Sequence, residues 1–104
     1  MTVKAIGGKR RMTDFDRLKQ AVRDLYGVEG DYQASVRVHE IINGKSGWAG
    51  IVEVFRIVHP QAKYAYAWNY KDDGGGKSHY PVVLGIPPID SAEDAVRAYF
   101  AAKR

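Results

Sequence analysis

Hydrophobic side chains recur every three to four residues between positions 15 and 25, which predicts a helix with one apolar face. These side chains are Phe15, Leu18, Ala21, Val22 and Leu25. Thr13 stands where a helix N-cap is expected, with Asp14 and Asp16 in the first turn, where the helix dipole favours negative charge. Gly27 provides a C-terminal stop. The first helix is therefore expected to begin after Thr13 and to end near residue 26.

After Asp31 the hydrophobic positions alternate with polar ones, which is typical of a half-buried strand. Asn43-Gly44 is a strong hairpin signal at the end of this strand. Three later segments are also expected to be extended, over about residues 48–58, 63–70 and 80–86. A glycine-rich loop, residues 71–78, separates the last two of them.

A second helix is predicted from about Asp90 to Ala102, because Pro87-Pro88 ends the last extended segment and Asp90 with Glu93 has capping-box spacing. The order of elements is α-β-β-β-(β)-α. We therefore expect an α+β fold in two layers, with an antiparallel sheet of three or four strands covered on one face by both helices. Residues 1–12 are expected to form a flexible basic arm, and residues 13–104 a single domain.

The register of the sheet decides which side chains are buried. Two-residue turns would place Tyr32 opposite Phe55, Val36 opposite Ile51, and Phe55 opposite Tyr66. The aromatic row Tyr64, Tyr66, Trp68 and Tyr70 would then lie in the core beneath the helices. A shift of one residue at the Pro60-Gln61 turn would instead expose the row as a platform on which nucleic-acid bases can stack. The pattern favours the core and leaves the platform as an alternative.

The opposite face of this sheet is expected to be open and half apolar. It would carry a basic set, Arg37, Arg56 and Lys63, and an apolar set, Trp48, Val52 and Val54. The basic set suits contacts with phosphate groups. The apolar set suits a protein partner or a second copy of the chain.

The net charge of +4 lies entirely within residues 1–12, which hold four basic side chains and no acidic one. The rest of the chain has twelve basic and twelve acidic side chains. A short basic segment of this kind often contacts nucleic acid. We therefore expect Lys9, Arg10 and Arg11 to contribute to a DNA- or RNA-binding surface together with the basic set of the sheet.

Catalytic and metal-binding patterns are weak in this sequence. Gly76-Lys77-Ser78 resembles the end of a phosphate-binding loop, but the earlier glycine and the following helix are missing. The three histidines have no local chelating spacing. Glu53, expected opposite Ala34 on the helix-covered face, is more simply explained by a hydrogen bond to a tyrosine or tryptophan than by catalysis. We expect no metal, no cofactor and no enzymatic activity, with a ligand carrier built around Glu53 as the weakest alternative.

The chain has no cysteine, and its longest apolar run is far shorter than the roughly 18 residues of a membrane span. No secretion leader is recognisable, so a cytoplasmic protein without membrane contact is expected. The favoured interpretation is a small non-catalytic binding module associated with nucleic acid. The alternative is a protein-interaction module, forming a homodimer or binding another protein, that uses the same sheet face.

Overall fold

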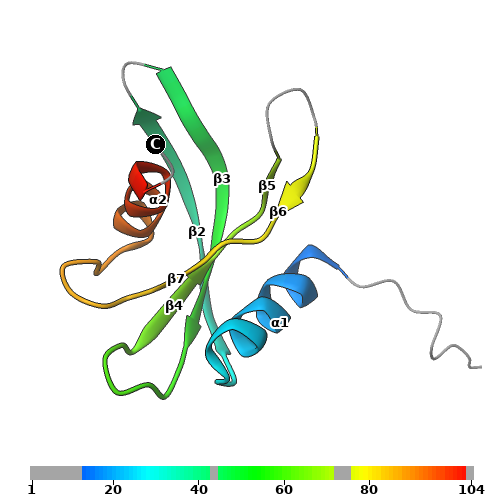
Figure 1. The fold of residues 1–104 in the computed structure, drawn as a ribbon, viewed down its shortest axis with the longest axis vertical. Helices are drawn as coiled ribbons and strands as arrows, with labels where there is room; N and C mark the ends of the chain where they lie inside the picture. The colour runs from blue at the N-terminus through cyan, green and yellow to red at the C-terminus, as the bar shows by residue number, and fades with distance from the viewer. Residues whose placement is uncertain (1–12, 43–44, 72–75, 103–104) are drawn as a thin grey trace, which may run out of the picture.

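The computed structural model describes residues 13–42, 45–71 and 76–102, so the predicted arm and the Asn43-Gly44 turn lie outside it (Figure 1). The elements in chain order are α1 (Asp14–Tyr26), β2 (Asp31–Ile42), β3 (Lys45–Arg56), β4 (Tyr64–Ala67), β5 (Tyr70–Lys71), β6 (Ser78–His79), β7 (Val82–Leu84) and α2 (Ala92–Ala102). A four-stranded antiparallel sheet has the order β2-β3-β4-β7, and β5 with β6 forms a second, two-stranded sheet. The predicted α+β class with an antiparallel sheet and two packed helices is confirmed.

Local chemistry sets the ends of both helices. In α1 the Thr13 hydroxyl accepts a hydrogen bond from the Asp16 amide, and the Asp16 carboxylate accepts one from the Thr13 amide. Gly27 ends α1 with a left-handed φ of 66°, so both predicted caps of this helix are confirmed. In α2 the predicted cap was placed one residue too early, because the Ser91 hydroxyl is the group that accepts from the Asp94 amide.

The strands form two hairpins that separate toward their tips. β2 and β3 make the first hairpin; β4 and β5, returning through β6 and β7, make the second. The second hairpin is interrupted between β4 and β5: the Trp68 amide donates to the Pro81 carbonyl at 3.3 Å, but Pro81 has no N–H to donate in return. The predicted third strand is therefore split into β4 and β5. Among the described residues, the two hairpins pair with each other only where residues 53–56 of β3 meet β4, and Figure 1 shows β3 and β5 diverging beyond that point.

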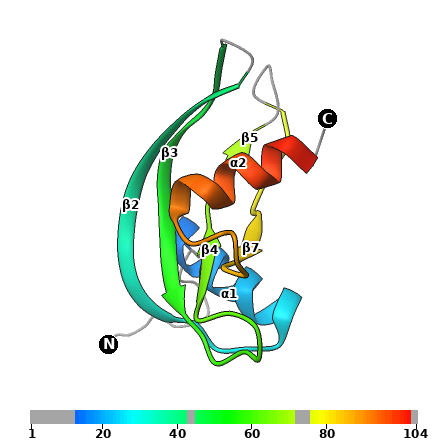
Figure 2. The same cartoon turned by 90° about the vertical axis from the view of Figure 1, so that its left-hand side faces the viewer.

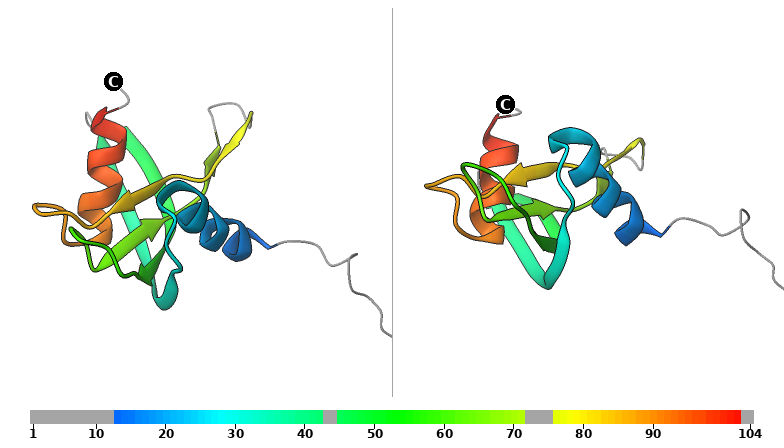
Figure 3. Two further views of the ribbon diagram at one scale, coloured as in Figure 1. Left: turned by 60° about the horizontal axis from the view of Figure 1, so that its bottom comes forward. Right: turned by 90° about the horizontal axis from the view of Figure 1, so that it is seen from below.

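The two helices contact alternate side chains of the same strands. Leu18 and Val22 of α1 pack with Phe55, in a cluster completed by Ile57, Ala62, Ala65, Ala67, Val82 and Leu84. Ala95 and Val96 of α2 pack with Val54, in a cluster completed by Val38, Val52, Tyr66, Trp68 and Ala92. Successive residues of a strand point to opposite faces. The helices therefore lie on either side of the sheet, as Figures 2 and 3 show, and each face is half covered where we expected one fully covered face.

One-residue changes of register explain this arrangement. Tyr32 pairs with Phe55 as predicted, but Val36 pairs with Val52 and not with Ile51. The change arises because Gly47 has no partner between the Glu40–Trp48 and Ile41–Ser46 pairs, and a second irregularity at Gln33 restores the original register.

The connection from β3 to β4 is also longer than the predicted two-residue turn. The Ile57 amide donates to the Lys63 carbonyl, and Phe55 pairs with Ala65 in place of Tyr66. Tyr66 and Trp68 are 5% and 0% exposed beneath α2, which confirms the core interpretation of the aromatic row.

Candidate functional site

The apolar set predicted as an interaction surface is not available on an open face. Val52 and Val54 are buried beneath α2, at 0% and 8% exposure. Trp48 is half-buried, and its ring lies 5.9 Å from that of Trp68. The expectation of an exposed patch centred on these residues is wrong, because α2 covers the face of β3 on which both valines lie.

The basic set predicted for the same face is divided between the two sides of the sheet. Arg37 lies between two residues of the α2 cluster, Val36 and Val38, so it points to the opposite face. Arg56 follows the alternation of Val54 and lies on the α2 side. Lys63 is exposed in the connection before β4. The structure therefore does not form a single basic sheet face, and Lys9, Arg10 and Arg11 lie outside the described residues.

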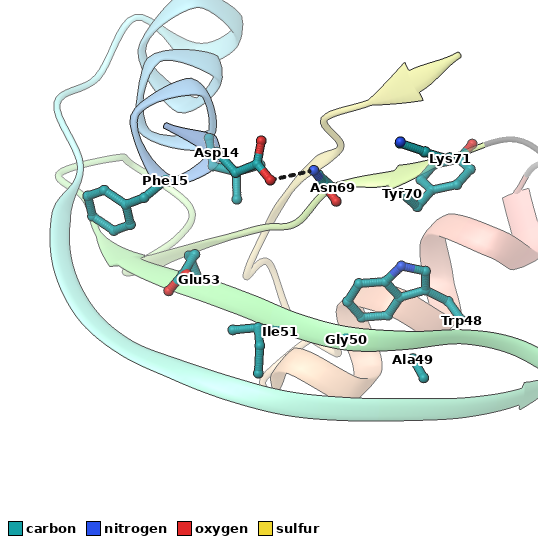
Figure 4. A pocket seen from close by; sticks show the side chains of 11 residues that line it. Asp14, Phe15, Trp48, Ala49, Gly50, Ile51, Glu53, Asn69, Tyr70 and Lys71 are labelled. Carbon is teal, nitrogen blue, oxygen red and sulfur yellow. Dashed lines mark hydrogen bonds between the residues drawn. The ribbon is translucent and has the colours of Figure 1, made fainter. Parts of the chain in front are cut away.

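The divergence of the two hairpins leaves a cleft between β3 and β5, with a volume of about 470 Å³. One wall is β3, the other is the chain from Asn69 to Lys71, and the first turns of α1 close the end (Figure 4). Its lining residues are Asp14, Phe15, Leu18, Trp48, Ala49, Gly50, Ile51, Glu53, Asn69, Tyr70 and Lys71. We refer to this site as the β3 cleft.

The β3 cleft exposes a strand edge. β3 is aligned with β2 from Lys45 to Arg56, but with β4 only from Glu53 onward. The Ile57 amide points toward the β4 side, since it bonds to Lys63. Backbone groups of a strand alternate in direction, so the amides and carbonyls of Ala49 and Ile51 also point to this side. Within the described residues no strand pairs with them there, and they border the cleft.

Two aromatic side chains, Trp48 from β3 and Tyr70 from β5, together form an aromatic wall on the α2 side of the β3 cleft. The Trp48 indole lies so close over Gly50 that a Cβ at this glycine would be 2.7 Å from its ring. Tyr70 stands across the cleft from Trp48 (Figure 4), and its ring is 5.8 Å from Tyr99 and 5.2 Å from Phe100 of α2. Because α2 supports Tyr70 from behind, this apolar wall is held in place by packing within the chain.

Polar groups of both signs line the other side of the β3 cleft. The Asn69 amide donates to the Asp14 carboxylate at 3.1 Å (Figure 4), which ties the start of α1 to the β4–β5 connection. Glu53 lies opposite Ser35, whose hydroxyl donates to its carboxylate. Glu53 thus has a hydroxyl partner as expected, but from serine and not from tyrosine or tryptophan. With Lys71 as the basic group, the lining carries two acidic side chains and one basic side chain.

A second hollow, of about 480 Å³, lies at the other end of the sheet between the β3–β4 connection and the segment before α2. Tyr64, Tyr66, Pro87, Ile89 and Asp90 are among its lining residues. Burial raises the pKa of the Tyr66 phenol, and the nearby Asp90 carboxylate raises it further, so the phenol is neutral at physiological pH. This hollow offers side-chain contacts, whereas the β3 cleft also offers a strand edge.

The described parts of the chain hold no cluster of three histidine or carboxylate side chains that is close enough to bind a metal ion. Within the same ranges, no helix combines the length and apolar composition that crossing a bilayer requires. Sequence reasoning missed Asp14, Asn69 and Lys71 as lining residues, because they come together only through the divergence of the hairpins. Comparison with models of protein families, with curated proteins and with solved structures gave no significant match.

Proposed function

We propose that the protein is a protein-interaction module that binds an extended segment of a partner polypeptide as an added strand in the β3 cleft. The observation that carries this proposal is the strand edge at Ala49 and Ile51, which no described strand covers. An extended peptide placed beside this edge completes the hydrogen-bonding pattern of β3. Strand addition of this kind is a common mode of peptide recognition.

The affinity of such a complex would come from two sources. Each backbone hydrogen bond to Ala49 or Ile51 contributes roughly 0.5–1.5 kcal/mol net. Side chains of the peptide alternate between the two faces, so every second one is directed toward the aromatic wall of Trp48 and Tyr70. Burial of apolar area against this wall adds about 25 cal/mol per Å². The backbone thus selects an extended conformation, and the wall selects for apolar side chains.

The charge of the lining favours a particular kind of partner segment. Asp14 and Glu53 lie on the α1 side of the cleft, and Lys71 is the basic group. A lysine or arginine among the residues that alternate toward α1 would meet these two carboxylates. We therefore expect the preferred segment to combine a basic residue on one face with apolar residues on the other.

Selection of random extended peptides on the full chain, followed by affinity measurement, tests this proposal. Ile51→Pro removes an amide donor from the cleft edge while leaving the neighbouring residues that pair with β2 unchanged. We expect it to weaken the selected peptides at least about tenfold, which is 1.4 kcal/mol. Ile51→Ala keeps the amide and is the matched control, with a smaller effect. Equal affinity for wild type and Ile51→Pro would contradict strand addition.

Nucleic-acid binding is a second candidate, favoured by the concentration of the whole excess charge in residues 1–12. Lys9, Arg10 and Arg11 form its basic group. Arg37 and Arg56 lie on opposite faces and do not extend that group into one surface. The candidate therefore depends on the N-terminal segment.

Fluorescence anisotropy with labelled single- and double-stranded DNA and RNA tests this second candidate. Replacing Lys9, Arg10 and Arg11 together with glutamine is expected to abolish binding, and raising the salt concentration is expected to weaken it. The Arg37→Ala variant is the control and is expected to bind like wild type. Absence of binding by the wild-type chain at low salt would exclude this candidate.

A further inference from the structure

We infer that the chain's own residues 2–6 occupy the β3 cleft when no partner segment is bound, and that a partner must displace them. This inference rests on the proposed strand-binding role of the cleft and identifies a competitor for it. The segment Thr2-Val3-Lys4-Ala5-Ile6 precedes α1 and lies outside the described residues. Three features of the molecule favour it as the occupant.

The first feature is position. α1 begins at Asp14, which is itself a lining residue of the cleft and is held to Asn69 on the opposite wall. The chain that precedes Thr13 therefore starts beside the cleft. Twelve residues span up to about 40 Å when extended, which is longer than the eight-residue stretch of β3 from Lys45 to Val52. The pair Gly7-Gly8 permits the reversal of direction that a return toward β3 requires.

The second feature is the side-chain pattern of the segment. In an extended conformation Val3 and Ala5 point to one face, and Lys4 points to the other. Val3 and Ala5 would then meet the apolar rings of Trp48 and Tyr70. Lys4 then points to the α1 side, where Asp14 and Glu53 lie. The segment thus has the composition that the lining favours in a partner.

The third feature is charge complementarity over the whole N-terminal stretch. Residues 1–12 carry four basic side chains and no acidic one, whereas the cleft carries two carboxylates and one ammonium group. Attraction between these charges raises the local concentration of the segment at the cleft and weakens as salt is added. The tether makes the binding intramolecular, so a modest affinity suffices for occupancy.

Occupancy by residues 2–6 would reduce the apparent affinity of the cleft for any partner segment. The apparent affinity is the affinity of the empty cleft multiplied by the fraction of molecules in which the cleft is empty. Lys4→Pro, which removes an amide and restricts the residue before it, is expected to empty the cleft and to strengthen binding of a selected peptide severalfold. Arg37→Ala, on the exposed face of β2, is the control and should leave the affinity unchanged.

A spin label tests the occupancy directly. The chain contains no cysteine, so Thr2→Cys gives a single attachment site for a nitroxide on the full chain. We expect strong paramagnetic broadening of the amides of Ala49, Ile51 and Lys71 in the labelled protein. Lys4→Pro and Ile51→Pro, each added to Thr2→Cys, should both remove it. Broadening that is absent, or that is unchanged by both substitutions, would overturn the inference.

A mixed sample separates an intramolecular contact from one between two molecules. One chain carries the nitroxide and no isotope, and it is mixed with a second chain that is isotope-enriched and carries no nitroxide. The isotope-enriched chain should show no broadening in the cleft; broadening there would overturn the intramolecular assignment.

The outcomes also distinguish this inference from the proposed function. If the label at residue 2 leaves the cleft unaffected while selected peptides still lose affinity on Ile51→Pro, the inference fails and the proposed function stands. If the peptides are insensitive to Ile51→Pro, the proposed function itself fails.

Discussion

Phe55 and Ile51 point to the same face of β3, but α1 covers only the first of them. Phe55 is fully buried, its ring lies 5.6 Å from that of Phe15, and its Cβ would be 2.9 Å from a Cβ built at Gly30. Ile51 borders the β3 cleft and is 39% exposed. Removing the Phe55 side chain leaves a cavity under α1, whereas removing the Ile51 side chain only enlarges an open cleft. The two truncations should therefore differ strongly in their effect on stability.

We expect Phe55→Ala to reduce the free energy of unfolding by about 3–5 kcal/mol, the usual cost of a buried phenylalanine. Ile51→Ala should cost about 1 kcal/mol, mainly from strand preference and partial burial. Urea unfolding followed by tryptophan fluorescence measures both values, since Trp48 and Trp68 lie in the α2 cluster. Phe55→Leu, expected to cost about 1–2 kcal/mol, keeps the comparison possible if the alanine variant is unfolded in water. Equal costs for Phe55→Ala and Ile51→Ala would refute the half-covered face.

Three further predictions concern residues of the two helices and their caps. Gly27→Ala should cost about 1 kcal/mol of unfolding free energy in urea titrations, because the φ of 66° is strained for alanine although its Cβ meets no atom within 4 Å; an unchanged midpoint would contradict this. The Arg97 guanidinium donates to both oxygens of the buried Glu40 carboxylate at 3.1 Å, so thermal unfolding should show a lower Tm for Arg97→Lys and a still lower one for Arg97→Ala, whereas a simple charge effect would leave Arg97→Lys as stable as wild type. The hydrogen bond between Asp90 and Asp94 raises the pKa of Asp90 and lowers that of Asp94, and Ser91 and Arg97 lower the pKa of Asp94 further. Carboxyl NMR titration should place the two pKa values on opposite sides of 3.8, the ordinary value of an aspartate. The stability that Asp94 contributes above its ordinary pKa should be lost as the pH falls through the pKa of Asp94 in the folded protein.

Local chemistry made much of the fold predictable from the sequence. The stripe from Phe15 to Val22, the Thr13 cap and the Gly27 stop each depend on residues within one or two turns of the chain, and α1 follows them closely. The alternation after Asp31 likewise predicted β2. Such signals survive folding because they stabilise the same local conformation in any tertiary context.

The register and the helix placement were not predictable in the same way. Gly47, which has no partner in β2, lies in β3 just after the hairpin turn. The Asn43-Gly44 pair predicts the turn but not this irregularity. The changes of register bring Val36 of β2 and Tyr66 and Trp68 to the face of Val52 and Val54, and α2 covers that face. The predicted open face was lost for this reason.

The β3 cleft depends on yet another feature, the break between β4 and β5. Trp68 reads as one more strand residue, and its side chain is buried beneath α2. Beyond Ala67 the second hairpin does not pair with β3, so among the described residues the edge at Ala49 and Ile51 has no strand partner. No periodicity of the sequence marks that separation, because it results from packing between α2 and the second hairpin.

The most direct test of strand addition is the set of intermolecular NOEs between a selected peptide and the full isotope-labelled chain. The account predicts contacts from the peptide backbone to the amide protons of Ala49 and Ile51, with peptide side chains alternating between Trp48 and the Asp14–Glu53 side of the cleft. A peptide whose contacts fall instead on the hollow lined by Pro87 and Ile89, with none to the β3 edge, would contradict it.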